Sequence, residues 1–93
     1  MLIGMCKIHL YFPNSHSLKD KRNILKGIKL RIQHNYNVSV CEIDNFDFWK
    51  NTTLGVACIG NDKEYINKVI NTITLFIEKQ SEMQLTSFEI NII

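Results

Sequence analysis

The first twelve residues alternate between two kinds of side chain, and this pattern limits the fold more than any other feature of the sequence. The even positions from 2 to 12 are apolar or small, whereas the odd positions from 3 to 11 mix apolar and polar groups. Because successive side chains of a strand point to opposite faces, the pattern predicts a β-strand with one face in the core. Pro13 ends it, since proline has no N–H to donate to a sheet ladder.

A helix is predicted to begin directly after Ser17. The Ser17 hydroxyl can accept a hydrogen bond from an early helical N–H, and Asp20 three residues later completes a capping-box pattern. From there the apolar residues recur with a helical period and gather on one side: Leu18, Ile24, Leu25, Ile28 and Ile32. We expect this apolar stripe to pack against the sheet.

The rest of the sequence predicts three more strands and one more helix. The strands are expected at residues 38–43, 54–59 and 85–93, with Phe88, Ile90 and Ile92 facing the core in the last one. The second helix begins at a capping box formed by Asn61 and Glu64. The order strand, helix, strand, strand, helix, strand is that of the ferredoxin-like βαββαβ fold. We therefore expect one α+β domain over residues 1–93, with a four-stranded antiparallel sheet, two helices on one face and the other face open.

Composition narrows the class of protein. No segment approaches the ~20 apolar residues of a membrane span, and the N-terminal residues lack a signal-peptide pattern, so we expect a cytoplasmic protein that does not enter the membrane. The three cysteines lie far apart in apolar, strand-like runs without a C-x-x-C pair. Buried, reduced thiols are therefore expected at Cys6, Cys41 and Cys58.

Charge is divided unevenly along the chain. Residues 1–40 hold seven Lys or Arg and one Asp, a net charge of +6, whereas residues 41–93 hold four Lys and eight acids, a net charge of −4. Such an asymmetry suits an anionic partner, or a second copy of the molecule, steered to one face.

Four cations of the first predicted helix form one row beside its apolar stripe. They are spaced three, four and three residues apart, which places them on one helical face: Lys19, Arg22, Lys26 and Lys29. We name these four residues the basic row. Such a row can bind phosphates with little sequence preference. The alternative is an ordinary solvated helix face.

Lys21 lies off this row, on the apolar side of the first helical turn. Because the first two strands run parallel in the predicted topology, the helix start lies near the end of the second strand and the segment after it. We expect Lys21 to form an ion pair there with Glu42, Asp44 or Asp47.

The segment between the second and third predicted strands, residues 44–51, is too long for a tight hairpin and is expected to contain a helical turn. Its aromatic residues, Phe46, Phe48 and Trp49, either pin this segment onto the core or stack a nucleic-acid base. Trp49 is therefore a candidate residue at the same sheet edge as Lys21.

Several sequence segments resemble the YlxP-like family of small bacterial proteins. These segments are residues 1–8 (MLIGMCKI), 17–22 (SLKDKR), 37–40 (NVSV), 54–57 (LGVA) with Asn61 and Asp62, and the pair Asp47 and Trp49. The resemblance implies the ferredoxin-like fold. It also suggests association with the ribosome, because members tend to be encoded beside translation-initiation and ribosome-assembly genes. It brings no catalytic residues.

Two classes of function stay open. An RNA-recognition motif is a poor match, because the exposed side of the third strand offers Gly55, Ala57 and Ile59 instead of stacking aromatics. No nucleophile, metal-ligand spacing or cofactor motif indicates an enzyme. The first class is a noncatalytic RNA- or ribosome-associated factor that binds phosphates through the basic row. The alternative is a protein-interaction or homodimerisation module whose open sheet face carries an apolar patch: Ile3, Met5, Tyr11 and Ile59.

Overall fold

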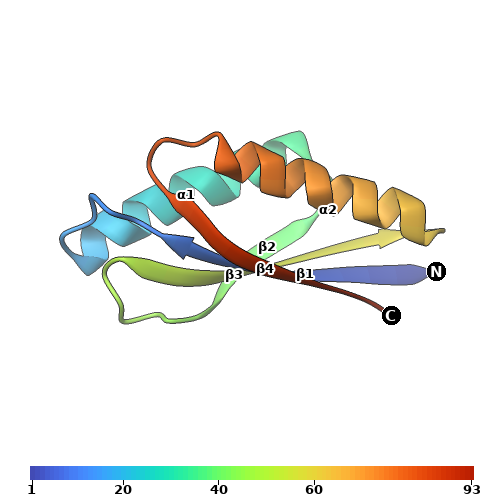
Figure 1. The fold of residues 1–93 in the computed structure, drawn as a ribbon, viewed down its shortest axis with the longest axis horizontal. Coiled ribbons are helices and arrows are strands. Elements are labelled where there is room, and N and C mark those ends of the chain that lie inside the picture. Colours follow the sequence, from blue (N-terminus) through green and yellow to red (C-terminus); the bar gives the residue numbers. More distant parts are fainter.

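The computed structural model describes residues 1–93 and has the predicted order of elements. These elements are β1 (Leu2–Tyr11), α1 (Leu18–Asn35), β2 (Ser39–Asp44), β3 (Asn51–Gly60), α2 (Lys63–Glu78) and β4 (Gln84–Ile92). One sheet has the strand order β2-β3-β1-β4, and every neighbouring pair is antiparallel. Both helices lie on the same side of the sheet (Figure 1). The ferredoxin-like α+β prediction is therefore confirmed.

Polar side chains cap both helices at their N-termini. Ser17 Oγ accepts a hydrogen bond from Asp20 N at 3.0 Å, as predicted for α1, and the Asp20 carboxylate accepts from His16 N at 3.0 Å. The predicted start of α2 is wrong by one residue, because Asp62 rather than Asn61 is the N-cap and accepts from Tyr65 N at 2.8 Å. Asn and Asp are equally good N-caps, so the sequence alone does not choose between two that are adjacent.

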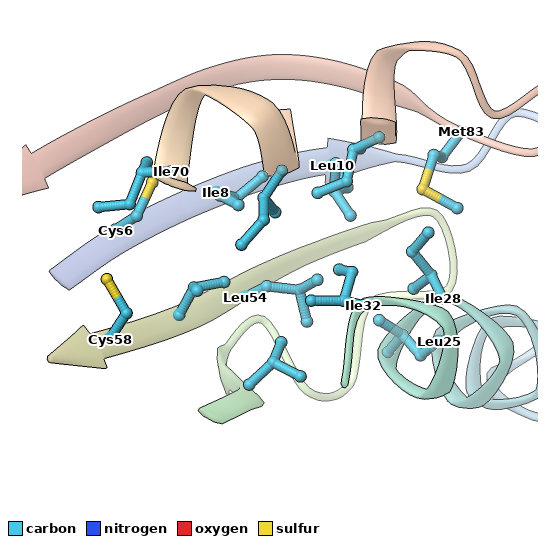
Figure 2. Close-up of a cluster of buried hydrophobic side chains, with 14 of the residues drawn as sticks. Cys6, Ile8, Leu10, Leu25, Ile28, Ile32, Leu54, Cys58, Ile70 and Met83 are labelled. Atoms are coloured by element: carbon cyan, nitrogen blue, oxygen red, sulfur yellow. The ribbon is translucent and has the colours of Figure 1, made fainter. Parts of the chain in front are cut away.

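The core lies between the sheet and the two helices. Sixteen buried apolar side chains form one cluster, to which β1 contributes Cys6, Ile8 and Leu10. Figure 2 shows these strand residues facing Ile70 of α2, with Leu25, Ile28 and Ile32 of α1 beside Leu54. The alternating face of β1 and the apolar stripe of α1 therefore meet as the sequence predicts. Neither helix has the length and apolar character needed to cross a membrane.

A bulge interrupts the pairing of β4 with β1. His9 lies opposite Ser87 and Leu10 lies opposite Leu85, so Thr86 is an extra residue whose hydroxyl donates to His9 O at 3.0 Å. The bulge turns Leu85 to the core side, where it packs against the buried cluster. Phe88 lies opposite Ile8 on this side too, but its position in an edge strand leaves it 39% exposed.

Substitution to alanine is expected to change stability in opposite directions at Gly4 and Gly27. A methyl group at Gly4, on the core face of β1, would overlap Ile66 Cγ2 of α2, whereas at Gly27 of α1 it would meet only an Arg31 guanidinium nitrogen at 3.5 Å. We expect Gly4→Ala to lower the free energy of unfolding by about 1–3 kcal/mol through overpacking. We expect Gly27→Ala to raise it by up to about 1 kcal/mol through helix propensity. Urea denaturation of both variants measures the difference, and equal effects would contradict this account of the core.

Candidate functional site

The candidate site lies at the end of the molecule away from both chain termini. The end of β1, the start of α1 and the connection between β2 and β3 gather there (Figure 1). We name residues 45–50, between β2 and β3, the aromatic loop. The sequence predicted this gathering of segments from the parallel course of β1 and β2.

Lys21 is buried at the centre of this end. Its side chain is 1% exposed, and its Nζ lies 3.0 Å from Glu42 Oε2. The same ammonium donates to three backbone carbonyl oxygens, of Asn45 at 2.8 Å, Phe46 at 3.1 Å and Asn51 at 3.2 Å. A buried lysine is stable only when its charge is paired and its donors are satisfied, and both conditions are met here. The predicted ion pair is therefore confirmed, with Glu42 as the partner.

The other two candidate carboxylates do not pair with Lys21. Asp44 and Asp47 are both exposed, and neither has a cationic group within 4.0 Å. Asp44 Oδ1 accepts a hydrogen bond from Asn45 N at 2.7 Å. Glu42 is instead fixed by a second partner, because its Oε2 also accepts from the Thr52 hydroxyl at 2.5 Å.

The aromatic loop contains a turn rather than the predicted helical turn. Asn45 has a φ of 63°, and Phe48 N donates to Asn45 O at 3.3 Å. Asn tolerates this left-handed conformation better than most residues, and its side chain donates to Thr53 Oγ1 at 2.8 Å. A φ of 63° lies outside the right-handed helical region, so a helical turn cannot include Asn45. The loop is also held at its far end, where Lys50 Nζ donates to Pro13 O at 2.8 Å.

The aromatic side chains of the loop point outward instead of pinning it. Phe46, Phe48 and Trp49 are 53%, 57% and 55% exposed. The interpretation that they fix the loop to the core is therefore wrong. The buried ammonium of Lys21 holds the loop instead, through hydrogen bonds to its backbone carbonyls. The sequence does not indicate such bonds, because they do not depend on the side chains of the loop.

The basic row lies on the outer surface of α1. Lys19, Arg22 and Lys26 are exposed and Lys29 is half-buried. None of the four has a carboxylate within 4.0 Å, since the ion pairs of this structure are Lys21 with Glu42 and Arg31 with Glu82. The row therefore presents four positive charges without an acidic partner in the molecule.

The open face of the sheet carries a shallow groove of about 540 Å³. Its lining includes Met5, Lys7, Cys41, Ile43, Ala57 and Glu89. Gly55 makes room for Ile43, whose Cγ2 would lie 2.8 Å from a Cβ at that position. Of the predicted apolar patch, Met5 and Ile59 are exposed, whereas Ile3 and Tyr11 are half-buried.

The cysteines differ from one another in exposure. Cys6 and Cys58 are buried as predicted, but Cys41 is exposed, because it lies on the open face of the edge strand β2. Burial, with a smaller effect of Glu89, raises the pKa of the Cys6 thiol to about 11. No three His, Cys, Asp or Glu side chains come together in an arrangement that could hold a metal ion.

The chain is similar to a protein family of unknown function, to a bacterial protein and to a designed protein of known structure. A family model described as a protein of unknown function, DUF503, matches residues 3–90. The uncharacterized protein YlxP of Bacillus subtilis (strain 168) is 32% identical over 85 residues, which cover 91% of this chain and 92% of that protein. The de novo designed protein Foldit4 has a TM-score of 0.52 at 16% identity, over 99% of this chain and 94% of the designed chain. The likeness to Foldit4 concerns the fold alone.

The buried ammonium predicts a large cost for removing the Lys21 charge. In Lys21→Met, Glu42 and three carbonyl oxygens lose their shared partner, so we expect the free energy of unfolding to fall by about 3–5 kcal/mol. Urea denaturation followed by circular dichroism measures it. The matched control is Lys19→Met, the same change at an exposed position, which should stay within about 0.5 kcal/mol of the parent. Equal stability of the two variants would refute the role given to Lys21.

Proposed function

This chain belongs to the family of proteins of unknown function DUF503, so we propose its role from its own geometry. We propose that it is a noncatalytic factor that binds phosphate groups of RNA through the basic row of α1. The RNA is either free or part of a ribosomal particle. The identity with YlxP confirms the family resemblance found in the sequence. The observation that carries the proposal is a row of four cations that no carboxylate of the molecule neutralises.

The length of the basic row supports contact with several phosphates. Lys19 and Lys29 are ten residues apart in α1, which at a rise of 1.5 Å per residue is about 15 Å. One strand of a nucleic acid carries a charge about every 3.4 Å along its axis, so the row spans roughly four phosphates. Lysines act there as point charges, and Arg22 adds a fork of donors that suits a phosphate.

The surroundings of His9 support a noncatalytic role. His9 Nδ1 lies 3.1 Å from Thr53 Oγ1, which is the spacing of a base and a hydroxyl nucleophile. However, Thr53 is only 3% exposed, and its oxygen already accepts from Asn45 Nδ2. A buried hydroxyl held in this way is not free to attack a substrate. We therefore interpret the contact between His9 and Thr53 as one that stabilises the fold.

A second candidate function rests on the groove of the open sheet face. Its apolar lining, together with exposed Met5 and Ile59, favours a protein-interaction module whose partner is a second copy of the chain. Covering apolar surface stabilises such a pair, and the effect depends little on salt. Phosphate binding weakens steeply as salt rises, so salt dependence separates the two candidates.

The first candidate predicts a loss of RNA binding on reversal of two charges of the basic row. We expect Arg22→Glu combined with Lys26→Glu to weaken binding of a uridine dodecamer at least about tenfold, because two phosphate contacts become repulsive. The slope of log affinity against log salt should fall from about −3 to about half that value. Fluorescence anisotropy at about 50 and 200 mM salt measures both quantities.

The matched control for this charge reversal is Lys63→Glu combined with Lys68→Glu on α2, which changes the net charge by the same amount away from the row. It should retain most of the affinity. If both double variants remain folded and bind equally, or if the parent chain does not bind, the basic row is only a solvated helix face.

The second candidate predicts a salt-independent dimer. Light scattering at high micromolar concentration should give the mass of two chains, and Ile59→Lys should give the mass of one, because a charge would enter the apolar contact. The control Leu75→Lys places a lysine at an equally exposed apolar position on α2 and should leave the dimer intact. A parent chain that stays monomeric would exclude this function.

A further inference from the structure

We propose that the aromatic loop is a docking surface for a basic segment of a partner protein, and that an arginine side chain of that segment binds beside Phe48. This interaction is separate from the RNA binding proposed for α1. It depends on the exposed aromatic side chains, on the fixed backbone beneath them, and on the charge of the residues around them.

The loop exposes an unusual amount of aromatic surface. More than half of each side chain of Phe46, Phe48 and Trp49 is exposed within four consecutive positions. Exposed aromatic groups gathered in this way are typical of the centres of protein interfaces. A few residues there, often including Trp, supply most of the binding energy. None of the three side chains belongs to the buried core, and the loop backbone is bound by the Lys21 ammonium.

The loop backbone is fixed before any partner arrives. The Lys21 ammonium binds the carbonyls of Asn45 and Phe46, and Lys50 O accepts from Phe12 N at 2.7 Å. A surface whose backbone is already ordered loses less conformational entropy on binding. The loop therefore resembles a rigid platform with outward aromatic groups.

Charge selects a cationic partner for this platform. Asp44 at the end of β2 and Asp47 within the loop are exposed, and neither is paired with a cation. The single cation of the loop, Lys50, turns its ammonium to Pro13 O. Phosphate groups would be repelled by the two carboxylates, whereas lysine and arginine side chains would be attracted.

A small hollow beside the loop favours arginine over lysine. It has a volume of about 260 Å³ and is lined by His9, Leu10, Asn45, Phe48, Asn51, Thr52 and Thr86. This is smaller than the ~300–1,000 Å³ of sites for small molecules, and suits one side chain. A guanidinium group can stack on the Phe48 ring while it donates to the amide and hydroxyl oxygens of the lining, which a compact ammonium matches less well.

Trp49 provides the test, because it is the one tryptophan of the chain. The full chain is titrated with a capped peptide in which four arginines alternate with glycine, and Trp49 emission is followed. We expect a saturable change, and binding of the corresponding lysine peptide about two- to fivefold weaker. Asp44→Asn combined with Asp47→Asn should weaken binding of the arginine peptide about tenfold.

Matched variants keep this test specific. Glu64→Gln combined with Glu78→Gln removes two exposed charges from α2 and should leave peptide binding unchanged. Phe48→Ala should reduce the preference for arginine over lysine. The double variant Arg22→Glu with Lys26→Glu should still bind the peptide, so a failure of the RNA proposal does not affect this result.

Four results would overturn the proposal: no saturable change of Trp49 emission with the arginine peptide, equal affinity for the lysine peptide, full binding by the Asp44 and Asp47 double variant, or, in the Arg22→Glu with Lys26→Glu variant, tighter binding of a uridine dodecamer than of the peptide by the same signal. The last result would instead identify the loop as a platform for nucleic-acid bases.

Discussion

The buried charge of Lys21 is the interaction on which this end of the molecule depends. One ammonium group joins α1 to Glu42 of β2, to Asn51 of β3 and to two carbonyls of the aromatic loop. Glu42 also accepts from Thr52 and the Asn45 carbonyl also accepts from Phe48 N, whereas the ammonium neutralises the Glu42 charge and satisfies the Phe46 and Asn51 carbonyls, whose loss of a partner would be costly. The position of the helix, the course of the loop and the end of the hairpin are therefore determined together rather than separately.

This arrangement separates charges that are adjacent in the sequence. Lys21 points inward, whereas Lys19 and Arg22 beside it project from the basic row. The same turn of α1 thus contributes to the interior and to a positive surface, while Asp44 at the end of β2 and Asp47 in the aromatic loop are exposed beside it. One end of a small protein carries a positive helix face and a negative aromatic loop, and the apolar groove occupies the open face of the sheet.

The pattern of side chains in the sequence predicted the fold and a carboxylate partner for Lys21. It could not predict the hydrogen bonds from Lys21 to backbone carbonyls, because every residue has a carbonyl. The alternation in β1 and the Ser17 cap gave the correct elements, and the position of Lys21 off the basic row indicated an ion pair. Nothing in residue identity distinguishes the carbonyl of Phe46 from any other, so the sequence did not show that Lys21, rather than the aromatic side chains, holds the loop. The bulge at Thr86 depends on pairing with His9, which is 77 residues away.

Both edges of the sheet are interrupted, whereas its centre is regular. The β1–β3 ladder continues over ten residue pairs without a break, but β4 is shifted at Thr86 and β2 is shifted between Glu42 and Asp44. A bulge twists its strand locally and leaves backbone donors and acceptors out of register, so each bulge limits how far a strand from another molecule can extend the ladder along that edge. Irregular pairing at both edges is one of the features by which sheet proteins discourage pairing between the edges of neighbouring molecules, and here it is found at both outer strands while the two central strands are left regular.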